Sequence, residues 1–203
     1  MLVGLAICIL GIALRLREII SRPFKADLSR PQGSVRRGIL FAFTLGMAPW
    51  EKESTRLHWI VYLRGIFFHV GIFTTFGVLF VSLLGISVSG LILWLTVAIT
   101  GLGAIFGLAG IVTRIMGENE RALSLPDDYA SIFIVSLFNA LGCIAAIWPA
   151  ALPIFYIVSA IMLVYIPVSK IRHCVYFFYS KFFFGMSFGR RGVIGQAKGK
   201  YAD

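Results

Sequence analysis

The chain has 203 residues, of which 59% are hydrophobic and only 14% are charged. A soluble domain usually has about 45–50% apolar and about 25% charged residues, so this composition excludes a soluble enzyme fold and predicts an integral membrane protein. The chain also carries 19 Lys and Arg residues against 9 Asp and Glu residues, a formal net charge of +10. Whether this charge indicates nucleic-acid binding depends on where the basic residues lie.

The N-terminal segment is apolar from Met1 to Ala13 and more weakly so to Ile20. It lacks the basic start and the small-residue cleavage site of a signal peptide, which favours a first transmembrane helix at about 1–20. Arg15 and Arg17 near its end can extend their charged groups to the membrane surface.

The next segment, 21–62, is predicted to be a loop with many basic residues. Its apolar stretch at 39–49 is too short to cross a bilayer. This stretch suits a helix that lies at the membrane interface, and an ordinary membrane-surface loop is the alternative.

Two long runs of the sequence, 65–113 and 129–169, contain no Asp, Glu, Lys or Arg. Each run is long enough for two crossings of about 20 residues and is interrupted in its middle by Gly, Pro or Ser residues. Each therefore predicts a helical hairpin, which satisfies its backbone hydrogen bonds internally, as a bilayer requires. The four predicted helices span about 63–85, 90–113, 129–148 and 152–173.

The predicted fold class is thus an all-α integral membrane protein with five transmembrane helices, forming one membrane domain over 1–203. With five crossings, the loop at 21–62, the third loop at 117–128 and the tail at 174–203 fall on one side, and the basic residues lie in these segments or at the adjoining helix ends. The positive-inside rule makes this side cytoplasmic, which places the N-terminus outside and predicts a multi-pass protein of the cell (inner) membrane. The charge is therefore explained without nucleic acid, and it favours anionic lipids or an acidic partner subunit.

Few reactive side chains lie within the predicted helices. The absence of an Asp or Glu in their interiors argues against a proton-coupled transporter. Cys8, Cys143 and Cys174 are isolated from one another, so they read as apolar fillers, and covalent haem attachment is excluded.

Histidine is the remaining candidate, at positions 58, 69 and 173. His69 lies about one and a half turns inside the second predicted helix, and His173 lies at the inner end of the fifth. Because both helices have their inner ends on the cytoplasmic side, the two imidazoles are expected at a similar depth. Two facing imidazoles are the ligands of six-coordinate haem b, a group suited to electron transfer.

The residues around these histidines suit a haem pocket. Gly65 lies one turn before His69 and would let a flat macrocycle approach the helix. Three cations are expected at the same depth in the membrane as the histidines and could pair with the haem propionates: Arg64, Lys170 and Arg172. Other interpretations stay open. His69 could form an interhelical hydrogen bond, and His173 could be an interfacial residue. His58 could be a surface residue, could replace His69 as ligand, or could contact a quinone.

Two short blocks resemble the gamma subunits of respiratory nitrate reductases, a cytochrome b type that is also similar to membrane subunits of heterodisulfide reductase-like complexes. They are residues 66–73, IFFHVGIF, and residues 167–173, PVSKIRH. The resemblance implies a five-helix haem b protein with partners that include a cytoplasmic iron–sulfur subunit. The family holds a second haem, but its two further histidines correspond here to Leu79 and Phe155, so only the cytoplasm-side haem is expected.

The sequence therefore predicts a single-haem subunit of a respiratory oxidoreductase. It would transfer electrons between membrane quinone and the cytoplasmic iron–sulfur partner, and the terminal catalysis would belong to its partners. Because ionisable residues occur only on the inner side, quinone exchange is expected nearer that face. The alternative is a cofactor-free membrane anchor or a small-solute carrier or channel component.

Overall fold

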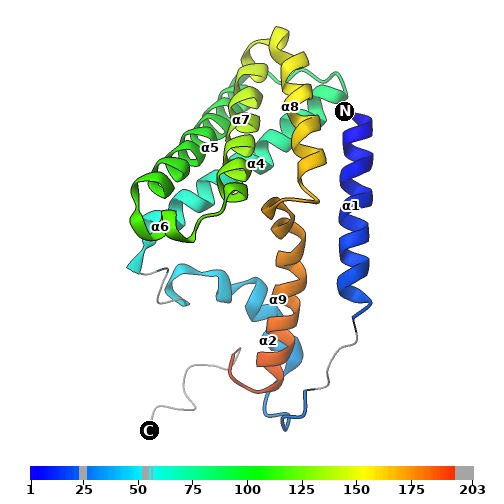
Figure 1. Cartoon of the computed structure of the whole chain (residues 1–203), viewed down its shortest axis with the longest axis vertical. Helices are drawn as coiled ribbons and strands as arrows, with labels where there is room; N and C mark the ends of the chain where they lie inside the picture. The colour runs from blue at the N-terminus through cyan, green and yellow to red at the C-terminus, as the bar shows by residue number, and fades with distance from the viewer. Residues whose placement is uncertain (23–26, 52–54, 56, 195–203) are drawn as a thin grey trace. The chain divides into compact units, whose positions relative to one another are not determined.

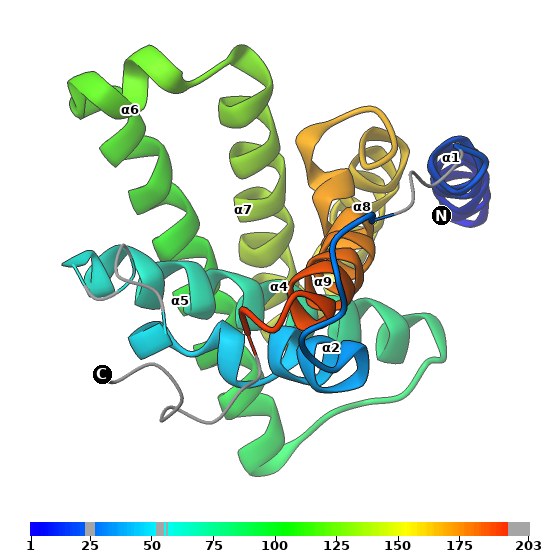
Figure 2. The same cartoon turned by 90° about the horizontal axis from the view of Figure 1, so that it is seen from below.

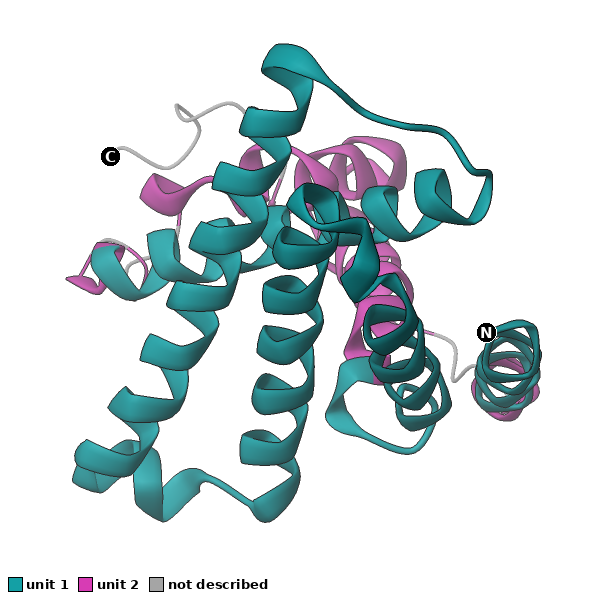
Figure 3. Ribbon diagram, turned by 90° about the horizontal axis from the view of Figure 1, so that it is seen from above, with its two compact units in different colours: residues 1–15, 60–171 teal, residues 16–59, 172–203 magenta. Residues whose placement is uncertain are grey.

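The computed structural model describes residues 1–22, 27–51, 55 and 57–194, and the regular elements in this part of the chain are all helices (Figure 1). The chain forms two compact units (Figure 3). Unit 1 comprises residues 1–15 and 60–171, and unit 2 comprises residues 16–59 and 172–203. The chain therefore passes between the units three times.

Three of the described helices are long and apolar enough to cross a membrane: α4 (Trp59–Leu83), α5 (Gly90–Met116) and α7 (Pro126–Ile147). They correspond to the helices predicted at about 63–85, 90–113 and 129–148. The shortest has 22 residues. At 1.5 Å per residue it is about 33 Å long and covers a hydrocarbon core of about 30 Å. A fourth span results if the two helical segments at Pro149–Tyr165 and Lys170–Arg190, which are separated by a bend, are counted as one. The chain is a multi-pass membrane protein.

The first predicted helix, at about 1–20, is present as α1 (Leu2–Ile20). It is not among the helices that qualify as spans, because Arg15, Arg17 and Glu18 lie near its end. The described helices therefore include three or four membrane spans, and the fifth predicted span stays a prediction.

The helix predicted at 152–173 is not continuous, which corrects that part of the prediction. α8 (Leu152–Tyr165) ends early, and after a short turn at 170–172 the chain begins α9 (His173–Arg190). Pro167 explains the break, since proline lacks a backbone N–H and its ring collides with the carbonyl of residue i−4. Much of the predicted tail, 174–203, is therefore helical, and its residues 195–203 lie outside the described part of the chain.

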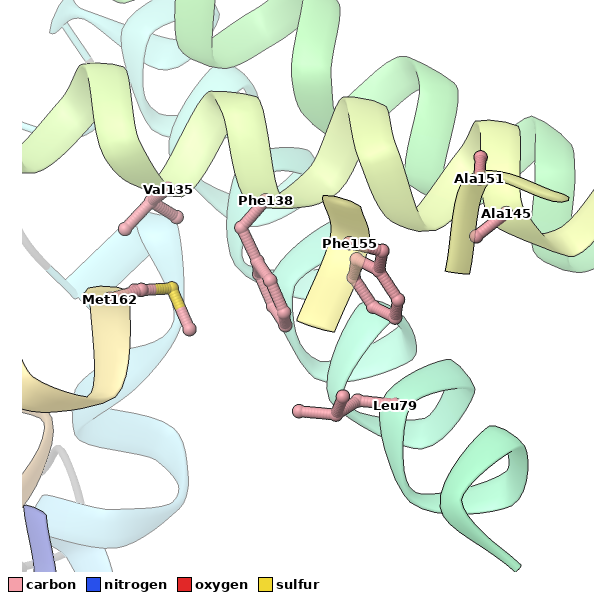
Figure 4. Packing of buried hydrophobic residues seen from close by; sticks show 7 residues of the cluster. All are labelled: Leu79, Val135, Phe138, Ala145, Ala151, Phe155 and Met162. Atoms are coloured by element: carbon pink, nitrogen blue, oxygen red, sulfur yellow. The ribbon is translucent and has the colours of Figure 1, made fainter. Parts of the chain in front are cut away.

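Unit 1 encloses an apolar core between α4, α7 and α8 (Leu152–Tyr165) (Figure 4). The stacked rings of Phe138 and Phe155 lie at its centre, with centroids 5.5 Å apart. α4 and α5 cross at glycines, and a Cβ atom added to Gly71 would lie 2.7 Å from the Cα atom of Gly103. The absence of side chains there lets the two backbones touch, as is common where membrane helices cross.

Unit 2 is built on a pair of helices, α2 (Val35–Phe43) and α9, which lie side by side (Figure 2). Their backbones also meet at glycines. A Cβ atom added to Gly38 would lie 2.2 Å from the carbonyl oxygen of Gly185. At the other end of α2, Phe43 packs against Phe177 and Phe178 of α9. The apolar stretch predicted at 39–49 thus contributes a helix followed by two short turns, at Leu45–Met47 and Pro49–Glu51. Residues 23–26, 52–54 and 56 of the predicted loop lie outside the described residues.

Candidate functional site

The imidazole of His69 is bound to its own helix. Its Nδ1 atom lies 2.7 Å from the carbonyl oxygen of Gly65, one turn earlier in α4. Because a carbonyl oxygen can only accept, Nδ1 carries the proton and donates it, and the lone pair of the neutral ring resides on Nε2. A histidine that binds a metal through Nε2 commonly holds its other ring N–H in this way, on a backbone carbonyl.

The surface of α4 around His69 is open. The His69 side chain is exposed, and a Cβ atom added to Gly65 would meet no atom within 4 Å. Arg64 precedes Gly65 in the chain, and its Nη1 atom donates to the Thr113 hydroxyl of α5 at 2.7 Å. Unit 1 thus holds an imidazole whose Nδ1 atom is bound, a glycine one turn earlier with open space above it, and a cation next to that glycine in sequence.

Lys170 has a defined environment at the break after α8. Its Nζ atom forms an ion pair of 2.6 Å with Asp128, and its backbone N–H donates to Asp127 at 2.8 Å. Asp127 also accepts hydrogen bonds from the hydroxyls of Tyr165 and Ser131. The two carboxylates at the start of α7 thus hold the end of α8 and the broken segment after it. Lys170 has an acidic partner within unit 1, in addition to the propionate role that the sequence predicts.

The remaining candidate residues belong to unit 2. His173 is the first residue of α9 and its side chain is exposed. Arg172 precedes it at the end of the short turn, and His58 lies exposed just before α4. The structure thus places His69, Arg64, Gly65 and Lys170 on one unit and the other three on the second.

The positions that correspond to a second haem in the resembled family are packed in the core of unit 1. Leu79 is 5% exposed and Phe155 is fully buried, and both belong to the same apolar cluster (Figure 4).

The polar contacts of three further residues are not predicted by the sequence. Thr113 binds Arg64, and Asp127 binds Tyr165 and Lys170. Asn139 is buried in α7 beside Thr75. Their partners lie 38 to 64 residues away in the chain, so no local spacing indicates them. Within the described ranges, no group of three or more His, Cys, Asp or Glu residues could hold a metal ion.

Comparisons of the chain with models of protein families, with curated proteins and with solved structures found no match in any of the three.

Proposed function

We propose that this chain is a haem b-binding membrane subunit that transfers electrons between membrane quinone and a cytoplasmic iron–sulfur partner of a respiratory oxidoreductase. The observation that carries the proposal is the hydrogen bond from His69 Nδ1 to the Gly65 carbonyl. It directs the ligand lone pair to Nε2, on a stretch of α4 where Gly65 leaves open space. An ionisable side chain within a membrane-spanning helix is by default a candidate functional residue.

In this proposal His69 and His173 are the two axial ligands. When bound between two imidazoles, haem b supplies a one-electron carrier with both axial positions closed. The missing side chain of Gly65 lets the flat face of the haem approach α4. Arg64 and Arg172 neutralise the propionates, with Lys170 shared between a propionate and Asp128. His58 is the alternative ligand or a quinone contact.

The proposed topology has five transmembrane helices, with the N-terminus outside and the C-terminus in the cytoplasm, in the cell (inner) membrane. The connections at 84–89 and 148–151 carry no charged residue, whereas the segments at 15–64 and 170–200, which adjoin the opposite ends of the spans, hold 17 of the 19 Lys and Arg residues. This asymmetry supports a cytoplasmic location for the latter.

The proposed partners follow from the resemblance to nitrate reductase gamma subunits at 66–73 and 167–173. A quinone exchanges both protons and electrons, and the acidic residues, from Glu18 to Asp203, all lie in segments assigned to the cytoplasmic side. Quinone exchange is therefore proposed near this side. The chain itself has an electron-transfer role without a catalytic residue of its own.

The test is a reduced-minus-oxidised absorption spectrum of the purified protein and of three histidine variants. His69→Ala and His173→Ala are expected to lose the b-type band, and His58→Ala is expected to keep it. If the wild-type protein lacks the band, the proposal fails in favour of a cofactor-free anchor or a small-solute carrier or channel component. If His58→Ala alone loses it, the ligand assignment is wrong.

A further inference from the structure

The charge of the protein is concentrated in unit 2. Residues 16–59 and 172–203 hold 14 of the 19 basic residues but only 5 of the 9 acidic ones, and so carry +9 of the formal net charge of +10. Unit 1, which holds nearly all of the three qualifying helices α4, α5 and α7, is almost neutral. Arg36 and Arg37, in the first turn of α2, have exposed side chains.

Unit 2 also exposes large aromatic side chains. Trp50 is 63% exposed and Trp59 58% exposed, and on α9 Phe178 is 62% and Phe182 50% exposed. Isolated apolar residues on a surface are ordinary, but a group of aromatic rings that accompanies a strong positive charge is typical of segments that bind a membrane interface. Tryptophan in particular is enriched at the level of the lipid headgroups.

The chain itself keeps unit 2 close to a bilayer. Unit 2 is joined to unit 1 at residues 15–16, 59–60 and 171–172, and α4, the first qualifying span, begins at Trp59. From these observations we propose that unit 2 lies in the headgroup layer of the membrane that unit 1 spans. Its aromatic rings insert below the headgroups, and Arg36 and Arg37 bind the phosphates of anionic lipids.

The glycine contacts between α2 and α9 give this module its form. Because Gly38 meets Gly185 and Gly189 backbone to backbone, the two helices pack closely against each other. The positive charge alone would also suit an acidic protein. The added exposure of Trp50, Trp59 and the α9 phenylalanines favours the lipid interface, since aromatic rings gain by leaving water for the acyl boundary.

The experiment uses the full-length protein, reconstituted into bilayers of phosphatidylcholine alone or with about 30% phosphatidylglycerol. Trp94 and Trp148, both exposed on unit 1, are replaced by phenylalanine, so that fluorescence reports Trp50 and Trp59. Brominated lipids then measure the depth of these rings. Quenching by bromines just below the headgroups is expected to be about twofold stronger in the anionic bilayer.

A matched pair of variants isolates the role of unit 2. Arg36→Gln and Arg121→Gln each remove one exposed positive charge, the first from unit 2 and the second from unit 1. The anionic-lipid effect is expected to weaken in Arg36→Gln, to weaken further with Arg37→Gln added, and to persist in Arg121→Gln. Equal quenching in both bilayers, quenching only by bromines near the bilayer centre, or equal losses in the two variants would overturn the proposal. The proposal would also be overturned if brominated lipids did not quench the tryptophan fluorescence while a co-purified protein shielded these rings from acrylamide in the aqueous phase. None of these outcomes depends on haem binding.

Discussion

The Nδ1 atom of His69 lies 2.7 Å from the carbonyl oxygen of Gly65, in the same helix and one turn away. Gly65 therefore has two effects on this imidazole. Its carbonyl fixes which ring nitrogen carries the proton, and its missing side chain leaves open the surface next to the ring. The two effects can be separated, because a substitution at Gly65 changes the side chain and keeps the carbonyl.

We expect Gly65→Leu to bind haem about tenfold or more weakly while the protein stays folded, because a Cβ atom at Gly65 would meet no atom within 4 Å and the new side chain would extend over the open face of α4. The measurement is the haem-to-protein ratio after purification, together with the thermal unfolding of the detergent-solubilised protein.

Gly77→Leu is the matched control. Gly77 lies on the same helix, and a Cβ atom there would also meet no atom within 4 Å. Its haem content is expected to match that of the wild type. Equal haem losses in the two variants would show that Gly65 has no special role.

The polar contact between α4 and α7 gives a second prediction. Thr75 Oγ1 lies 2.9 Å from Asn139 Oδ1, and both residues are fully buried. Thr75→Val keeps the shape and removes the hydroxyl, so it is expected to cost about 0.6–1.7 kcal/mol of stability, the range for interhelical hydrogen bonds in membranes. Thr74→Val is the control, because the exposed Thr74 hydroxyl donates only within its own helix, to Val70. Unfolding in mixed detergent micelles measures both, and an equal cost would contradict the interhelical assignment.

The glycine contact of unit 2 gives a third prediction. A Cβ atom at Gly185 would lie 2.6 Å from the Cα atom of Ile39, which is main chain and cannot move aside. Gly185→Leu is therefore expected to separate α2 from α9 and to speed tryptic cleavage after Arg36 and Arg37. Ser180→Leu adds the same side chain at an exposed position of α9 and should leave the cleavage rate unchanged. Unaltered cleavage in Gly185→Leu would refute the close contact.

Asp27 of unit 2 provides a prediction on pH. The Ser29 backbone N–H, with Arg191 as the second cause, lowers the pKa of Asp27 from 3.8 to about 2. A lowered pKa means that the folded state favours the carboxylate, so this stabilisation is complete above pH 3.8 and is lost as the pH falls through about 2. The difference in unfolding midpoint between wild type and Asp27→Asn should be constant above pH 4 or so and vanish near pH 2. A difference that persists below that range would contradict the role of Asp27.

The membrane spans could be predicted from the sequence because two long runs without charge leave few other folds available. The break after α8 could not be placed in the same way. The apolar run continues past Pro167 to Ser169, and hydropathy alone does not distinguish a straight helix from a broken one.

The candidate site was predictable in part. His69 is conspicuous as the one ionisable side chain between Gly65 and Thr113 that could bind a metal. Its bond to Gly65 depends on the ring rotamer, and the contacts of Lys170 with Asp127 and Asp128 join segments more than 40 residues apart. Such relationships arise from tertiary packing and have no signature in local spacing.

The central claim is that one haem b is bound at His69. The most direct measurement is the number of haem b groups per chain in the purified wild-type protein, obtained from its pyridine haemochrome spectrum and its protein concentration. The proposed function predicts about one haem per chain, since one pair of axial histidines is available. A protein purified from haem-sufficient cells with no haem would contradict the claim, and two haems per chain would contradict the single site.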